Sequence, residues 1–110
     1  MQISAKETND IKIVLIDGKL DTNTAPDAEK YVNKLLDQGS NKLLFNFENL
    51  DYISSSGLRL LLATAKQLKN ISGEMRLCNL NEVVQEIFDI SGFNSILTVM
   101  KSKEDALEGF

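Results

Sequence analysis

The sequence predicts an α/β fold, with about four helices packed on a mixed sheet of four to five strands. Two kinds of apolar pattern support this fold class. Short apolar segments with strand-like alternation take turns with longer segments whose apolar residues recur at helical spacing, in the order β-β-α-β-α-β-α-β-α. The chain has 110 residues, 43% of them hydrophobic, with one proline and no internal repeat, so we expect one domain over residues 1–110.

Two strands are expected at the start of the chain, over residues 3–7 and 11–17. Asn9-Asp10 supplies turn chemistry between them. The second strand is apolar on both faces in its second half, which is typical of a central strand, and Gly18 is expected to end it.

The first helix is expected to begin at Thr24, which has N-cap chemistry, with Asp27 three positions later as in a capping box. Pro26 is tolerated in a first turn, and Gly39 is the expected stop. One face of this helix is apolar and comprises Ala25, Ala28, Val32, Leu35 and Leu36.

The middle of the chain is expected to form a strand over 42–47, a loop over 48–53 and a second helix over about 57–70. Leu60 lies off the apolar stripe of that helix, so we expect it to be partly exposed on a monomer, which is a mild indication of an interface. The stripe itself comprises Leu58, Leu61, Leu62, Ala65 and Leu68.

The last third of the chain predicts a strand over 74–80, a helix capped by Asn81 and stopped at Ser91-Gly92, and a final strand over 96–100. Ser102 then begins a C-terminal helix, with an acidic residue three positions later. The apolar residues carried by these two helical segments are Val83, Val84, Ile87, Phe88, Ala106 and Phe110.

The composition argues against several classes of function. The chain has no histidine and no metal-ligand spacing, so we expect no metal, no cofactor and no Ser-His catalytic pair. The single cysteine, Cys78, lies in a strand-like segment and is expected to be a small core residue rather than a reactive thiol. The net charge is −4 and the sequence shows no basic stripe, so nucleic acid is not an expected partner. Lys66 and Lys69 form at most a small basic patch.

The first ten residues are polar and of mixed charge, unlike a signal peptide. No apolar run approaches the ~18–20 residues that span a bilayer. We therefore expect a soluble, cytoplasmic protein without a membrane partner, and its single cysteine requires no oxidising compartment.

The most informative segment is Asp51-Tyr52-Ile53-Ser54-Ser55-Ser56-Gly57-Leu58-Arg59. Its three serines and glycine stand before an amphipathic helix, where free backbone N–H groups and the helix dipole favour an anion. A phosphate on a serine there changes the surface charge by about −1.5 to −2. On spacing alone, the simplest interpretation is that the serines only cap the helix.

The same segment resembles the signature of anti-sigma factor antagonists, which are STAS domains, where Asp-Ser-Ser/Thr/Ala-Gly-Leu opens the second helix. Gly18-Lys19-Leu20-Asp21 is similar to the family's turn before the first helix. Phe88-Asp89-Ile90-Ser91-Gly92-Phe93 is similar to its Leu-Phe-x-x-Ser/Thr-Gly-Leu segment. Residues 43–50 and 73–78 also fall in register, so the resemblance covers nearly the whole chain and implies a STAS fold.

The resemblance implies a switch between binding partners. In the family the phosphorylated serine lies two residues before the glycine, which is Ser55 here. Ser56 is the second choice, and Ser54, which replaces the usual aspartate, is the third. The unphosphorylated protein is expected to bind an anti-sigma factor that is also a serine kinase, freeing the sigma factor, and a serine phosphatase reverses the modification. The partner surface is expected to comprise Asp21, Ser54, Ser55, Ser56, Gly57, Leu58 and Arg59.

Two alternatives stay open. A STAS binding module outside sigma control would bind another kinase or phosphatase, or serve as a soluble subunit of a transport system. An enzyme would need a base for its nucleophile, and without histidine a Ser-Lys pair such as Ser55 with Lys66 is the remaining arrangement. Asp21 could equally be a turn or cap residue or a partner-binding residue. The oligomeric state also stays open.

Overall fold

The computed structural model describes all residues from Met1 to Phe110, and it confirms the α/β class. Six strands form one mixed sheet, at least one more than expected. They are β1 (Gln2–Thr8), β2 (Ile11–Leu20), β3 (Lys42–Asn46), β4 (Leu50–Ile53), β5 (Glu74–Cys78) and β6 (Thr98–Met100). The helices are α1 (Ala25–Asp37), α2 (Ser55–Asn70), α3 (Glu82–Ser91) and α4 (Lys103–Leu107), with a 3₁₀ turn, η1 (Phe93–Ser95).

The sheet runs in the order β1-β2-β3-β5-β6, and β4 pairs with the end of β2 outside this path. β1 is antiparallel to β2, and every other pairing is parallel. Asn9 and Asp10 form the predicted turn between β1 and β2, both with positive φ as type I′ hairpins require. The carboxyl ends of the parallel strands therefore meet at one edge of the molecule.

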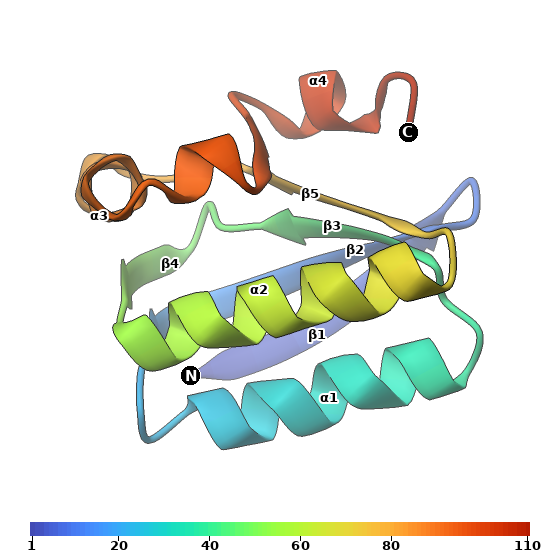
Figure 1. Cartoon of the computed structure of the whole chain (residues 1–110), viewed down its shortest axis with the longest axis horizontal. Coiled ribbons are helices and arrows are strands. Elements are labelled where there is room, and N and C mark those ends of the chain that lie inside the picture. The colour runs from blue at the N-terminus through green and yellow to red at the C-terminus, as the bar shows by residue number, and fades with distance from the viewer.

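Two cores lie on opposite faces of the sheet. Figure 1 shows α1 and α2 side by side along one face and α4 on the other. Alternation along β3 sends Leu43 and Phe45 into the larger core and Leu44 into the smaller one. The smaller core consists of Ile11, Leu44, Cys78 and Ala106.

Three helix ends follow the predicted chemistry. The Asn81 side chain accepts a hydrogen bond from the Val84 N–H at 2.8 Å, and the Ser102 hydroxyl accepts one from the Asp105 N–H at 3.1 Å. Gly92 ends α3 in the left-handed region, with φ of 78°. None of the helices combines the length and apolar character needed to cross a membrane.

Two expectations are wrong, the end of β2 and the assignment of residues 48–53 as a loop. β2 does not end at Gly18 but continues to Leu20, across an irregularity between Gly18 and Lys19. The segment expected as a loop contains β4, which pairs with this extension of β2. The extension therefore holds the chain in place immediately before the serine run.

The expectation that Leu60 is partly exposed is also wrong, because its side chain is only 5% exposed. α2 packs against α1 as well as against the sheet, so two of its sides are covered. Leu62 and Ala65 lie at the margin of this arc and are half-buried. Leu60 thus belongs to the larger core and gives no indication of an interface.

Candidate functional site

The serine run lies at the carboxyl edge of the parallel strands, where β4 ends and α2 begins (Figure 1). The Ser54 N–H donates to the Leu20 carbonyl at 2.9 Å, which ties the run to the end of β2. Across from it lies the loop between β2 and α1, since the Thr22 and Ser56 hydroxyl oxygens are 3.1 Å apart. This edge is where open α/β sheets commonly place their binding sites.

The three serines have different tasks although they are neighbours. α2 begins at Ser55, two residues earlier than expected, so Ser54 is the N-cap residue, and its hydroxyl accepts a hydrogen bond from the Ser56 N–H at 3.2 Å. Ser55 is exposed in the first turn, and its hydroxyl has no hydrogen-bond partner in the chain. Helix capping therefore accounts for the hydroxyl of Ser54 but gives no structural role to the hydroxyl of Ser55.

Ser56 is held from two sides. Its hydroxyl lies 3.1 Å from that of Thr22 and also accepts a hydrogen bond from Arg59 Nη2 at 3.1 Å. The guanidinium of Arg59 is thereby placed beside the first turn of α2. Thr22 was missed from sequence, because its contact with Ser56 joins residues 34 positions apart and no local pattern marks it.

Gly57 and Leu58 support the site from below. Both are buried. A Cβ atom on Gly57 would lie 2.6 Å from Ile53 Cγ1 and 2.8 Å from the Leu20 carbonyl oxygen, closer than real Cβ atoms come. The missing side chain lets α2 start directly against β2 and β4, while Leu58 packs in the larger core.

Asp21 organises the loop opposite the serines. Its Oδ1 accepts hydrogen bonds from the Asn23 and Thr24 N–H groups at 3.0 and 3.1 Å. Thr24 is the N-cap residue of α1, but its hydroxyl makes no cap bond and donates to the Lys19 carbonyl at 2.8 Å. Asp21 therefore has the turn role that the sequence allowed, and it sits one residue from Thr22 at the site.

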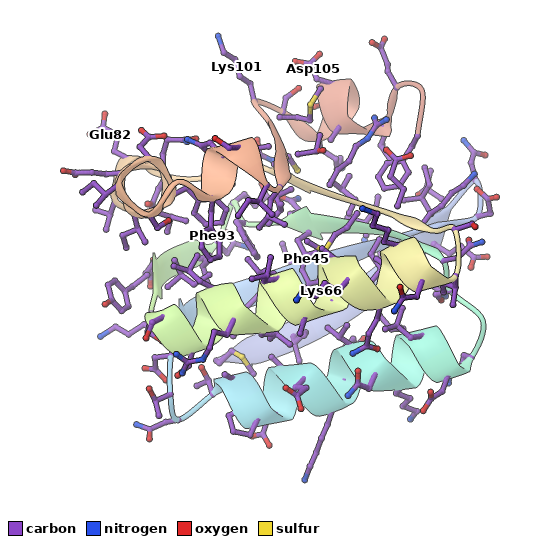
Figure 2. All side chains as sticks on the ribbon, viewed as in Figure 1. Phe45, Lys66, Glu82, Phe93, Lys101 and Asp105 are labelled. Atoms are coloured by element: carbon purple, nitrogen blue, oxygen red, sulfur yellow. The ribbon has the colours of Figure 1, made fainter.

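The Ser55–Lys66 pair is excluded by geometry. Ser55 and Lys66 both lie on α2, eleven residues apart, which is about 16 Å along the helix axis. A lysine side chain cannot bridge that distance. Figure 2 shows Lys66 in the middle of α2, well away from the first turn.

A shallow groove of about 360 Å³ runs beside the serines, between the first turns of α1 and α2. Thr22, Pro26, Ser56 and Arg59 are among its lining residues. Ser55 does not line this groove and is exposed to solvent next to it in the sequence. The site is therefore an open surface, of the kind that binds another macromolecule rather than enclosing a small molecule.

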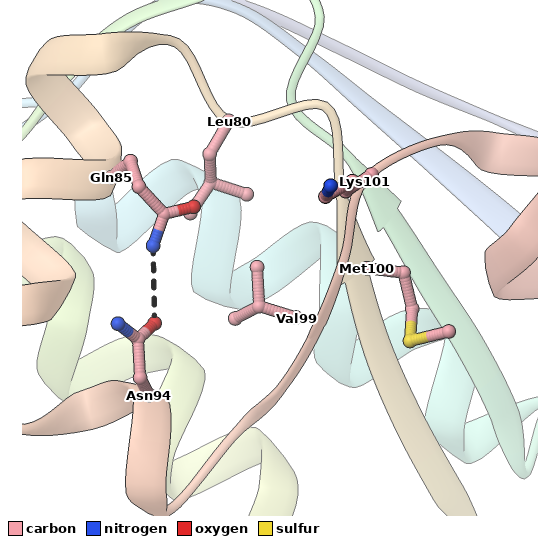
Figure 3. Close-up of a pocket in the computed structure, with 6 residues that line it drawn as sticks. All are labelled: Leu80, Gln85, Asn94, Val99, Met100 and Lys101. Atoms are coloured by element: carbon pink, nitrogen blue, oxygen red, sulfur yellow. Dashed lines mark hydrogen bonds between the residues drawn. The ribbon is translucent and has the colours of Figure 1, made fainter.

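A separate pocket of about 410 Å³ lies between α3 and β6 (Figure 3), lined by Leu80, Gln85, Asn94, Val99, Met100 and Lys101. Gln85 Nε2 donates to Asn94 Oδ1 at 3.3 Å, so these two polar groups satisfy each other. None of the residues predicted from the serine run lines this pocket.

Cys78 lies in the smaller core, fully buried as expected from the sequence. Burial raises the pKa of its thiol from 9.0 to about 11, and the nearby negative charges of Glu48 and Glu104 act in the same direction. The thiol is therefore protonated at neutral pH and is not a nucleophile.

Comparison with known proteins agrees with this geometry. The STAS domain family matches residues 2–106 of the chain. The chain belongs to the STAS domain family. This STAS domain is 36% identical over 110 residues to BtrV of Bordetella bronchiseptica, whose name describes it as an anti-sigma factor antagonist; the match covers 100% of this chain and 95% of that protein. It is 28% identical over 91 residues to the anti-sigma-B factor antagonist of Staphylococcus aureus, covering 83% and 84% of the two chains.

Solved structures share the fold. An anti-sigma factor antagonist homologue from Thermotoga maritima superposes with a TM-score of 0.92 at 21% identity, covering 96% of this STAS domain and 92% of that chain. The Bacillus protein SpoIIAA in its phosphorylated form superposes with a TM-score of 0.73 at 22% identity, covering 97% of each chain.

Proposed function

We propose that this STAS domain, acting as one domain over residues 1–110, is an anti-sigma factor antagonist. Its unphosphorylated form binds an anti-sigma factor that is also a serine kinase, and this binding frees a sigma factor. Phosphorylation of Ser55 ends the binding, and a serine phosphatase restores it. On this proposal the chain is a ligand and a substrate in the cytoplasm, not an enzyme.

One observation carries the choice of Ser55. Among the three serines, its hydroxyl alone is exposed and free of hydrogen bonds to the chain, whereas those of Ser54 and Ser56 accept bonds that hold the first turn of α2. A kinase that modified Ser54 or Ser56 would first have to break those bonds. Ser55 requires no such rearrangement.

The electrostatics of the first turn favour a switch that leaves the fold intact. Ser55 is the first residue of α2, and this turn contains no acidic side chain. A phosphate at a helix N-terminus interacts favourably with the free N–H groups and the helix dipole. Phosphorylation is thus expected to change what this surface binds rather than how the domain folds.

The loss of binding follows from desolvation. A partner that packs closely on Ser55 in the unphosphorylated form has to bury about −1.5 to −2 additional charge after phosphorylation. Burying such a charge without a cationic partner costs several kcal/mol. We expect affinity to fall about a hundredfold or more, equivalent to ~3 kcal/mol.

The named relatives support this proposal. BtrV and the Staphylococcus aureus protein both carry anti-sigma factor antagonist names, and SpoIIAA has a phosphorylated form. The direct test is a phosphosite map by mass spectrometry of the protein isolated from its native host, with Ser55→Ala and Ser56→Ala variants beside it. We expect phosphate on Ser55, lost in the first variant and retained in the second. Absence of phosphate under every growth condition would favour a STAS binding module without a phospho-switch.

Binding provides the second test. Titration calorimetry with the kinase should give tight binding for Ser55→Ala and at least tenfold weaker binding for Ser55→Asp, since aspartate carries only part of the charge of a phosphate. Ser72→Asp is the matched control, because it places the same charge on an exposed serine just beyond the other end of α2, and it should bind as tightly as Ser55→Ala. Equal affinities for Ser55→Ala and Ser55→Asp would contradict the switch.

A further inference from the structure

α3 carries an apolar row in which two of the three side chains are exposed. Val83, Ile87 and Ile90 are spaced by four and three residues, which places them on one side of the helix. The side chain of Val83 is 52% exposed and that of Ile90 is 79% exposed, whereas Ile87 between them is half-buried. The core side of the same helix is occupied by Val84 and Phe88 instead.

An acidic row runs beside the apolar one. Glu82, Glu86 and Asp89 have the same spacing of four and three, one position earlier in the chain, and α3 contains no basic residue. None of these carboxylates takes part in an ion pair within the chain. Asp89 accepts a hydrogen bond from Gln85, which leaves Glu82 and Glu86 as free charges. Figure 2 shows Glu82 pointing away from the body of the molecule.

The start of α3 lies close to the serine site. The Asn81 side chain, which caps α3, donates to the Leu50 carbonyl at 3.0 Å and so ties the start of α3 to β4. β4 ends one residue before Ser54, and its Tyr52 is 43% exposed between the two regions. In Figure 1, the first turn of α2, β4 and α3 follow one another along the same end of the molecule.

We propose that Tyr52 and the acidic–apolar face of α3 (Glu82, Val83, Glu86 and Ile90) form a second part of the docking surface for the anti-sigma factor kinase. This inference rests on the proposed function. The kinase segment seated on α3 is an apolar stretch flanked by lysine or arginine, because such a segment covers the exposed row and neutralises the unpaired carboxylates beside it. Ser55 then acts as the switch, while α3 adds contact area and charge steering that phosphorylation does not alter.

Site-specific photocrosslinking in the native host tests this arrangement. The photoreactive residue p-benzoylphenylalanine replaces Val83 or Ile90 in a Ser55→Ala background, which holds the binding form. Asn23, exposed in the loop at the serine site, is the positive position. Ile71 is the matched control, because it is 53% exposed but lies at the far end of α2. We expect positions 23, 83 and 90 to capture the same kinase, identified by mass spectrometry, and position 71 not to.

The other outcomes distinguish failure of the α3 surface from failure of the proposed function. Capture of the kinase at position 23 but not at 83 or 90 would overturn the α3 surface and leave the proposed function in place. Capture of a second copy of this chain, or of another protein, at 83 and 90 would also overturn it. Failure to capture a kinase at any position would contradict both proposals.

Charge reversal tests the chemistry of the occupant. With the purified kinase, Glu86→Lys should weaken binding at least tenfold at low ionic strength, and 0.5 M salt should shrink the difference because screening removes it. Asp37→Lys, an exposed reversal at the end of α1, should bind like the unchanged protein. Equal affinity for Glu86→Lys and Asp37→Lys, with Ser55→Asp still weakened, would show that the kinase does not contact α3.

Discussion

The function proposed for Ser55 depends on the hydrogen bonds that the hydroxyl groups of Ser54 and Ser56 make. Ser54 caps α2, and Ser56 is held by Thr22 and Arg59. These bonds fix the first turn of the helix without using the hydroxyl of Ser55. A chemically uniform run of serines thus presents a single unoccupied hydroxyl to the solvent.

Arg59 is expected to pair with a phosphate on Ser55. It lies four residues after Ser55 on α2, and its guanidinium already reaches Ser56. In protein carrying phosphoserine at position 55, Arg59→Gln should raise the second pKa of the phosphate, normally about 6, by about half a unit. A ³¹P NMR titration measures this shift. Lys66→Gln, further along the same helix, should leave the value unchanged, and an equal response to both substitutions would argue against the pair.

Cys78 is expected to make stability depend on pH in the alkaline range. Its pKa is raised to about 11 in the folded protein, against 9.0 ordinarily. The contribution of the protonated thiol to stability is therefore complete below pH 9 and is lost as pH rises toward 11, by up to ~3 kcal/mol. Urea unfolding of the unchanged protein and of Cys78→Ala at several pH values tests this. The difference in unfolding free energy between them should narrow above pH 9, and parallel curves would disprove the linkage.

At the scale of secondary structure, Gly57 determines how closely α2 approaches the sheet. Gly57→Ala is expected to destabilise the fold by about 1–3 kcal/mol, because the new Cβ meets Ile53 and Leu20 below 3 Å. This cost should exceed the gain of about 1 kcal/mol in helix propensity. Chemical denaturation measures the change, with the exposed Ser55→Ala in the same turn as control. If the Gly57→Ala variant were more stable than the unchanged protein, β4 would have to shift away from the new Cβ at little cost.

The elements that the sequence predicts well are those with a long internal pattern. α1 and α2 show their apolar faces over many residues, and Asn81, Gly92 and Ser102 mark helix ends by local chemistry. β4 has only four residues, two of them exposed, so no alternation identifies it. Its existence depends on the extension of β2, about 30 residues earlier in the chain.

The same limit applies to the candidate site. The position of Ser55 before Gly57 could be recognised through resemblance to a family. The engagement of Ser56 by Thr22 could not, because it depends on how the loop after β2 folds back over α2. The predicted exposure of Leu60 was wrong for a similar reason, because its burial depends on α1 packing against α2.

At the scale of the whole molecule, the two faces of the sheet are covered very differently. α1 and α2, with 13 and 16 residues, cover the larger core, whereas α4 has only five residues. So short a helix is not stable by itself and depends on tertiary contacts. Ala106 and Leu107 provide apolar contacts in the smaller core, and Arg76 of β5 provides hydrogen bonds.

Arg76 is expected to be the main anchor of the C-terminal segment. Its guanidinium donates to the carbonyls of Ala106, Glu108 and Gly109 at 3.0, 2.6 and 3.0 Å, and it lies 4.7 Å from the centre of the Phe110 ring. Arg76→Ala removes these contacts together and leaves the carbonyls of Ala106, Glu108 and Gly109 without this donor. We expect a loss of about 2–4 kcal/mol, since hydrogen bonds to a charged group contribute more than neutral ones.

Hydrogen exchange distinguishes local from global loss in this variant. The Ala106 N–H, which donates to the Ser102 carbonyl, should exchange much faster in Arg76→Ala, while the amides of β3 should exchange faster only to the extent that overall stability falls. Arg59→Ala, which removes an exposed arginine near the start of α2, should leave α4 protected. If α4 and β3 instead accelerate by the same factor, α4 opens only when the whole domain unfolds, and Arg76 stabilises the fold as a unit rather than anchoring one segment.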